Sequence, residues 1–226
     1  MQTLTGLSEM KTALVVGATG LVGRHLVDLL LQDRRYTRVK IFVRRAAGID
    51  DESLEEHIVD FDDVDSWKGN LTGDDLFSAL GTTARHAGSQ TAQYKVDFTY
   101  QYEVAKAAAA NGVDRYFLVS SPAASPRSRS FYLRTKGELE AAVSQLPFRR
   151  IAIFQPSILV GEREEHRRAE ALGGHVLRTL ARHIPALRPY RPIDGRVVAK
   201  AIIKATERDT DETVSRYRLA TLHEMA

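Results

Sequence analysis

The 226-residue chain contains no cysteine, and this absence excludes disulfide bonds, zinc–thiolate sites and thiol catalysis. No segment approaches the ~18 consecutive apolar residues of a membrane-spanning helix, so we expect no membrane partner. Residues 1–11 lack the charged start and apolar stretch of a secretory signal, and we expect a cytoplasmic protein. The seven histidines are scattered without the short spacing of metal ligands, so no metal is expected.

A strong charge of one sign is also absent. The 32 Lys and Arg residues and the 29 Asp and Glu residues leave a formal net charge of +3. Opposite charges are interleaved, as in EREEHRRAE at residues 162–170, which is typical of a solvated surface. Nucleic acid is therefore not expected as a partner. A hydrophobic content of 43% and this length predict one domain over residues 1–226.

Short apolar runs alternate with amphipathic runs along the chain. Strand-like runs occupy residues 12–16, 38–43, 56–61, 74–80, 114–121 and 149–156. Helix-like runs occupy 21–32, 91–111 and 131–146, and further along we expect helices at 172–184 and 194–207 and a last strand at 215–220. Strands joined through helices predict an α/β fold with a doubly wound parallel sheet, covered by helices on both faces.

The first strand runs into three regularly spaced glycines in ALVVGATGLVGR, residues 13–24. In a strand–loop–helix setting, the first glycine makes a tight turn, the second lets a pyrophosphate approach, and the third lets helix and strand pack closely. The helix N-terminus then offers N–H groups to the phosphates. We assign to this nucleotide site Gly17, Thr19, Gly20, Leu21, Val22 and Gly23. The alternative is a tight turn with only a structural role.

The second strand is followed by Arg44 and Arg45, at the position where proteins that bind NAD usually carry an acid for the adenosine ribose. Guanidinium groups form charge-assisted hydrogen bonds with a 2′-phosphate, whereas an acid repels it. The sequence therefore favours NADP(H) over NAD(H). Two solvent-facing arginines in a generic loop are the alternative interpretation.

The ends of the third and fourth strands also point to the cofactor, because the carboxyl ends of parallel strands line the ligand crevice. Asp60 is a candidate acceptor for the adenine amino group, and Phe61 follows it. Leu80, Gly81 and Thr82 are candidates for close approach of the backbone to the cofactor ribose.

The candidate catalytic residues follow the fifth strand, which ends in Ser120 and Ser121. Tyr132 and Lys136 are spaced four residues apart, so on a helix they share one face. An ammonium group beside a phenol favours the phenolate, which suits Tyr132 to donate or accept a proton at a substrate oxygen. Lys136 is also a candidate to hold the nicotinamide ribose, and a serine hydroxyl to hold the substrate oxygen. A core tyrosine with a surface lysine is the alternative.

Four motifs in this order, GATGLVG, LGTT, VSS and YLRTKGELE, resemble those of an atypical short-chain dehydrogenase/reductase. The stretches FYLRTKGELE and LGTTARHAGS, with the Val96-Asp97 pair, resemble the branch of the oxidoreductase HIV Tat-interacting proteins and their bacterial relatives. The resemblance covers about residues 11–206. It implies a Rossmann fold, a preference for NADP(H), and a catalytic triad of Ser121, Tyr132 and Lys136.

Two positions depart from the pattern that this resemblance implies. The superfamily has an asparagine on the long helix, and the nearest counterpart here is Asp97, which does not donate as an amide does. After the sixth strand, members of the family often read Arg-Pro-Gly, and here the sequence is Gln155-Pro156-Ser157. The resemblance implies that this loop faces the nicotinamide end, so Pro156 joins the residues expected near the cofactor. Ser120, at the end of the fifth strand, is expected there as well.

We therefore expect an NADP(H)-dependent oxidoreductase that acts on a small-molecule carbonyl or alcohol substrate, with Tyr132 as proton donor or acceptor. The alternative is a regulator that binds NADP(H) and a protein partner without turnover; a nucleotide-sugar epimerase is disfavoured by the short C-terminal portion. Residues from about 157 to 226 are expected to cover the substrate side, and the loop 82–90, with His86, to close over the nicotinamide. The possible partners also include a second copy of the chain, since the sequence is compatible with a homodimer.

Overall fold

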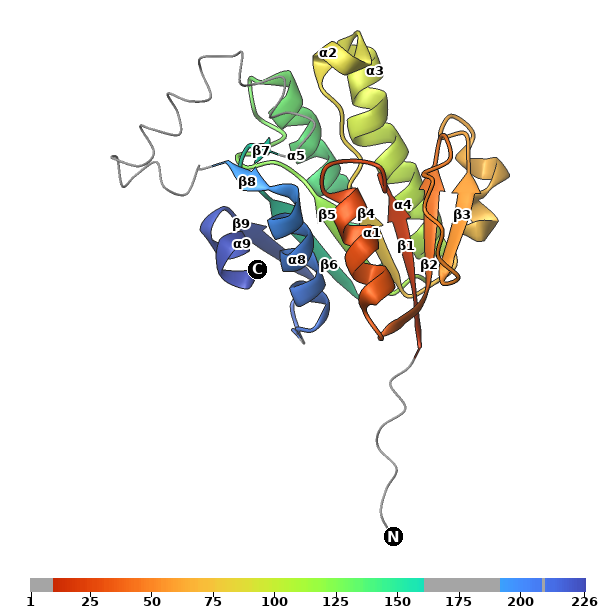
Figure 1. The fold of residues 1–226 in the computed structure, drawn as a ribbon. Coiled ribbons are helices and arrows are strands. Elements are labelled where there is room, and N and C mark those ends of the chain that lie inside the picture. Colours follow the sequence, from red (N-terminus) through yellow and green to blue (C-terminus); the bar gives the residue numbers. More distant parts are fainter. Residues whose placement is uncertain (1–9, 161–191, 209) are drawn as a thin grey trace.

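The computed structural model describes residues 10–160, 192–208 and 210–226, and its centre is a parallel sheet (Figure 1). The sheet has seven strands in the order β3-β2-β1-β4-β5-β6-β9, and every neighbouring pair is parallel. The strands are β1 (Lys11–Val16), β2 (Tyr36–Val43), β3 (Leu54–Ile58), β4 (Asp75–Ser78), β5 (Arg115–Val119), β6 (Arg150–Gln155) and β9 (Val214–Arg218). The strand order reverses beside β1, which is the switch point where doubly wound folds bind their ligands.

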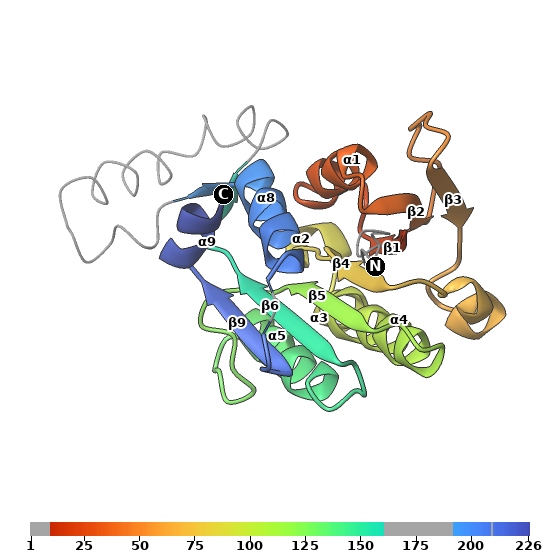
Figure 2. The same ribbon diagram turned by 90° about the horizontal axis from the view of Figure 1, so that it is seen from below.

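Helices cover both faces of the sheet (Figure 2). On one face lie α1 (Gly23–Gln32) and α8 (Gly195–Thr206), and on the other lie α4 (Tyr100–Ala110) and α5 (Phe131–Val143). The predicted α/β, doubly wound fold class is confirmed. All the strand carboxyl ends consequently meet at one edge of the sheet, which we call the carboxyl edge.

Each face of the sheet has its own apolar core. On the α1 side, Val15 packs with Leu26 and Ile202. On the α4 side, Leu14 packs with Val104. Successive residues of β1 thus serve opposite cores, and burial on both faces explains why this strand is a continuous apolar run rather than an alternating one.

The third strand begins and ends earlier in the sequence than predicted. It is β3 at Leu54–Ile58 rather than residues 56–61. The apolar side chain of Phe61 suggested a strand, but it lies in the turn after β3 and is buried by an edge-on contact with Trp67. Two short 3₁₀ turns, Val64–Ser66 and Lys68–Asn70, follow.

The long helix expected at 91–111 is divided into three parts. It begins as α3 (Gln90–Tyr94), passes through a π-helical turn at Lys95–Thr99, and continues as α4. Nothing in the composition of this stretch distinguishes the π turn from α-helix. Single π turns are frequent at functional sites, and this one contains Asp97.

Other elements were missed or misplaced. A four-residue helix α2 (Ala84–Ala87) lies in the loop after β4, a two-stranded sheet joins β7 (Leu159–Val160) to β8 (Ile193–Asp194), and α9 (Ala220–Met225) closes the chain. The last strand ends at Arg218 rather than at residue 220, because Leu219 turns the chain with a φ of 37°. The helix predicted at 194–207 is α8, whereas the one predicted at 172–184 lies outside the described residues.

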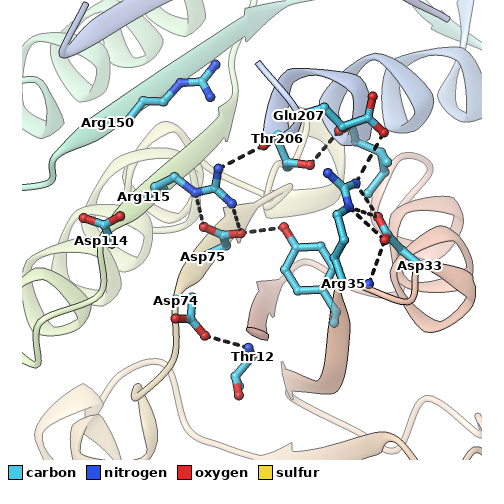
Figure 3. Close-up of polar contacts among 12 residues, drawn as sticks. Thr12, Asp33, Arg35, Asp74, Asp75, Asp114, Arg115, Arg150, Thr206 and Glu207 are labelled. Atoms are coloured by element: carbon cyan, nitrogen blue, oxygen red, sulfur yellow. Dashed lines mark hydrogen bonds and ion pairs between the residues drawn. The ribbon is translucent and has the colours of Figure 1, made fainter. Parts of the chain in front are cut away.

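The amino-terminal edge of the sheet is closed by a buried polar cluster (Figure 3). Arg115 at the start of β5 donates from Nε and Nη2 to the two carboxylate oxygens of Asp75, each at 2.5 Å. Its Nη1 donates to the carbonyl of Thr206 at 2.9 Å, and the hydroxyl of Tyr36 donates to Asp75 at 2.5 Å. Burial, together with the neighbouring Asp75, raises the pKa of Tyr36. This cluster joins β2, β4, β5 and the end of α8 at the edge opposite the candidate site.

Candidate functional site

The glycine loop between β1 and α1 has no room for side chains at two of its three glycines. Gly17 has a φ of 81°, and a Cβ there would lie 2.5 Å from the carbonyl carbon of Ala79. A Cβ on Gly23 would lie 2.0 Å from the carbonyl oxygen of Gly17. At Gly20 the nearest atom would be that same oxygen at 3.2 Å, so this position is less crowded. The loop is therefore a tight turn on which the first turn of α1 packs directly.

The start of α1 has the electrostatics of an anion site. Its first turn contains no acidic residue, and its N-cap, Val22, makes no side-chain capping bond. The first N–H groups of a helix have no partner within the helix, and they carry a partial positive charge. Thr19 is exposed beside them, and Leu21 is half-buried. A bound pyrophosphate fits this loop because backbone, rather than side chain, faces it.

The first residue of α8 makes a second close contact with the glycine loop. A Cβ on Gly195 would lie 2.3 Å from the carbonyl oxygen of Leu21, so the first residue of α8 packs directly on the loop. Sequence reasoning missed this contact. A glycine at the start of a predicted helix gives no indication of which distant segment it touches.

Arg44 and Arg45 directly follow β2 at the carboxyl edge, and both are exposed. Neither forms a hydrogen bond or ion pair within the described ranges 10–160, 192–208 and 210–226. The loop that they begin is tied to β3, because the N–H of Ala47 donates to Glu56 Oε1 at 2.7 Å. Two unpaired guanidinium groups next to the switch point are suited to a phosphate.

Asp60 and Phe61 lie beyond β3 in its following turn. Asp60 is exposed, and its Oδ1 accepts a hydrogen bond from the N–H of Asp62 at 2.9 Å. Its second carboxylate oxygen is not needed for that turn. The side chain of Phe61 belongs to the core, so only its main chain is left to face a ligand.

The segment after β4 runs through Leu80, Gly81 and Thr82 at the carboxyl edge. The N–H of Thr82 donates to Asp97 Oδ1 at 3.2 Å, which connects this segment to the π turn. The predicted loop 82–90 contains α2, where the hydroxyl of Thr83 caps the helix by accepting from the N–H of His86 at 3.3 Å. His86 is exposed.

The two serines after β5 have different surroundings. The hydroxyl of Ser120 donates to Glu140 Oε1 at 2.6 Å, and the same oxygen accepts from Gln155 Nε2 at 2.8 Å. Ser121 is also buried, but its hydroxyl makes no hydrogen bond to another described residue. Ser120 is thus committed to a network inside the protein, whereas the hydroxyl of Ser121 is available to a ligand. Pro156 is buried at the end of β6.

Tyr132 and Lys136 lie one turn apart at the start of α5. Tyr132 is 36% exposed, and Lys136 is buried. Lys136 Nζ lies 3.4 Å from Asp97 Oδ1, so the lysine is held in an ion pair across to the π turn. The helix is fixed against the preceding loop at Gly137, where a Cβ would lie 2.2 Å from the carbonyl carbon of Ser125.

Asp97 is the residue of the candidate site whose contacts sequence reasoning did not foresee. The sequence identified it as part of the Val96-Asp97 pair and as a departure from the usual asparagine, but not by its contacts. Its side chain is fully buried and contacts both Lys136 and Thr82. The signal available beforehand was an acid at the position of the usual asparagine, in a sequence that also carries a Tyr-x-x-x-Lys motif. Within the described residues no cluster of metal-ligating side chains is present and no helix is long and apolar enough to cross a membrane.

Comparisons with known proteins identify the family of the chain. The family model for NAD(P)H-binding proteins matches residues 17–222. The chain is 34% identical over 204 residues to "Protein fmp52, mitochondrial" of Emericella nidulans, covering 87% of each chain. It is 34% identical over 168 residues to the protein HTATIP2 of Rattus norvegicus, covering 73% of this chain and 69% of that one.

A solved short-chain dehydrogenase/reductase superfamily protein from Agrobacterium tumefaciens with bound NAD has the same fold. It superimposes with a TM-score of 0.65 at 17% identity, over 94% of this chain and 81% of that one. The expectation of a cytoplasmic protein is wrong, because the fungal relatives that match the chain are named mitochondrial. The chain belongs to the NAD(P)H-binding family, and it resembles the atypical short-chain dehydrogenase/reductases of the HIV Tat-interacting protein branch.

Proposed function

We propose that this protein is an NADP(H)-dependent oxidoreductase that reduces a carbonyl compound or oxidises the corresponding alcohol. The observation that supports this proposal most strongly is the arrangement on α5, where the partly exposed Tyr132 lies one turn before the buried Lys136. A lysine is seldom buried without a counter-charge, and here the buried ammonium, paired with Asp97, lies at the carboxyl edge where the cofactor is expected.

In this proposal the glycine loop holds the pyrophosphate through the start of α1, and Arg44 and Arg45 hold the 2′-phosphate. Their exposure and their lack of partners among the described residues support this role, because a phosphate then costs no existing ion pair. Asp60 accepts from the adenine amino group with the carboxylate oxygen that its own turn does not use. The segment from Leu80 to Thr82 lies against the ribose.

In this proposal, side chains of the protein transfer the proton and position the substrate oxygen. The hydroxyl of Tyr132 gives a proton to the carbonyl oxygen during reduction and takes it back from the alcohol during oxidation. The ammonium of Lys136 stabilises the phenolate that is left and holds the nicotinamide ribose. Ser121 donates a hydrogen bond to the same substrate oxygen, and Ser120 does not, because Glu140 already accepts from it. The nicotinamide, when bound, supplies or accepts the hydride.

The described C-terminal elements support a single domain in which residues from about 157 to 226 cover the substrate side. The two-stranded sheet of β7 and β8 leads into α8, whose first residue contacts the glycine loop at Leu21. A polypeptide that packs on the cofactor loop in this way is suited to form part of the substrate site.

The test is consumption of NADPH with a panel of aldehydes and ketones, comparing the wild type with Tyr132→Phe. We expect Tyr132→Phe to lower turnover by about 10²- to 10⁴-fold while NADPH binding is retained. Tyr102→Phe on α4 is the matched control and is expected to leave turnover unchanged. If the wild type binds NADPH but consumes none of it with any carbonyl compound, the enzyme proposal fails and a cofactor-sensing regulator takes its place.

A further inference from the structure

The side chains of Asp97 and Lys136 form an ion pair, and both are buried. The carboxylate is 0% exposed and the lysine side chain 3% exposed, and Nζ lies 3.4 Å from Oδ1. Taking an ammonium out of water is costly unless a negative charge accompanies it. Asp97 is the acid that accompanies Lys136, so the lysine depends on it to stay buried at the site.

The same carboxylate oxygen reaches a second segment of the site. Asp97 Oδ1 accepts from the N–H of Thr82 at 3.2 Å, while Oδ2 is buried and has no partner among the described residues. A Cβ on Gly81 would lie 3.7 Å from Oδ1, which shows how closely the backbone passes. One oxygen atom thus connects the segment after β4 to α5.

The π turn fixes the position of Asp97. Gln101 Nε2 donates to the carbonyl oxygens of Asp97 at 3.0 Å and of Val96 at 3.4 Å. Gln101 is in turn oriented by Ser78 at the end of β4, whose hydroxyl donates to Gln101 Oε1 at 2.8 Å. Both side chains are buried. Side-chain hydrogen bonds from Gln101 and Ser78 therefore support the π turn.

We propose that Asp97 is a positioning residue that holds the Lys136 ammonium and the Thr82 backbone in fixed relation, so that the cofactor ribose meets a preformed site. This inference rests on the proposed function, in which both segments contact the cofactor. The negative charge is the essential feature. An asparagine keeps the shape and the acceptor for Thr82 but leaves the buried ammonium without a counter-charge.

A double-mutant cycle on NADPH affinity, followed by nicotinamide fluorescence, tests this inference. Asp97→Asn is expected to weaken binding about tenfold, as for loss of one charge-assisted hydrogen bond. Lys136→Met is expected to weaken binding as well. The double variant is expected to bind no more weakly than Lys136→Met alone, because Asp97 acts on the cofactor through the lysine. Glu103→Gln, an acid-to-amide change on α4 after the π turn, is the matched control and should bind as the wild type does.

A melting curve of each variant shows whether it is folded. If Asp97→Asn is unfolded, Asp97→Asn/Lys136→Met is compared with Lys136→Met alone, since the double variant has no unpaired buried ion and keeps an acceptor for Thr82. The two affinities should then be equal.

Two outcomes overturn the inference while leaving the proposed function intact. In one, Asp97→Asn binds as tightly as the wild type although Lys136→Met does not. In the other, the loss in the double variant is the product of the two single losses, so that Asp97 acts independently of Lys136. A wild type that binds neither NADPH nor NADH overturns the proposed function and the inference together.

Discussion

The substitution Gly23→Ala should damage both stability and cofactor binding. A Cβ at this position would lie 2.0 Å from the carbonyl oxygen of Gly17, whereas ordinary contacts begin near 3.4 Å. The glycine loop and α1 must therefore move apart by more than about 1 Å. The atom encountered is backbone, so no side-chain rotation relieves the clash.

The magnitude follows from two opposing effects. Overpacking costs typically 1–3 kcal/mol, and a clash with backbone belongs at the upper end of that range. Alanine is favoured over glycine in a helix by up to about 1 kcal/mol, which offsets part of the cost. The expected net loss is about 2 kcal/mol, which lowers the Tm by about 4–8 °C in a domain of this size. Displacement of the loop should also weaken NADPH binding about tenfold or more.

Thermal denaturation and fluorescence titration with NADPH measure the two effects. Gly69→Ala is the matched control, because a Cβ at Gly69 meets nothing within 4 Å. Gly69→Ala should leave both measurements unchanged. Wild-type stability and affinity in Gly23→Ala would refute the reasoning, since they would mean that the close contact does not constrain the loop.

The buried cluster at the amino-terminal edge gives two further predictions. Asp75→Leu should lower the free energy of unfolding by about 3–5 kcal/mol because it leaves the buried Arg115 without a counter-charge. Asp75→Leu/Arg115→Met should recover most of this loss in urea denaturation, and equal instability of the two variants would contradict this explanation. Burial and Asp75 raise the pKa of Tyr36, so its stabilising contribution is present below about pH 10, the ordinary tyrosine value, and is lost as the pH rises further. Tyr36→Phe should therefore lose stability less steeply than the wild type above about pH 10, and an unchanged slope would count against this assignment.

The sequence predicted the sheet because its strands are short apolar runs separated by helical ones. Six of the seven strands lie close to their predicted positions. The prediction for β3 extended too far because it included Phe61, whose burial comes from a turn packed on Trp67 rather than from a strand. The π turn at Lys95–Thr99 was not predictable from composition, since the Gln101 side chain that bonds to it is oriented by Ser78 from a distant strand. The contact of Gly195 with the glycine loop depends on tertiary packing alone.

At the candidate site, local spacing identified the residues but not their partners. The four-residue spacing of Tyr132 and Lys136 correctly placed them on one helix. It gave no means of separating Ser120 from Ser121, because the difference is the contact of Ser120 with Glu140. It also gave no means of seeing that Asp97 reaches Lys136, because that contact requires two helices to pack side by side.

The most direct test of the central claim is a titration of the wild type with NADPH and NADH, alongside Arg44→Ala/Arg45→Ala. Arg34→Ala/Arg38→Ala is the control, since it removes the same charge from exposed positions around the start of β2. The account predicts that the wild type prefers NADPH, that Arg44→Ala/Arg45→Ala loses this preference while still binding NADH, and that the control keeps it. Equal binding of both cofactors would contradict the assignment of a 2′-phosphate site, and binding of neither would contradict the proposed function itself.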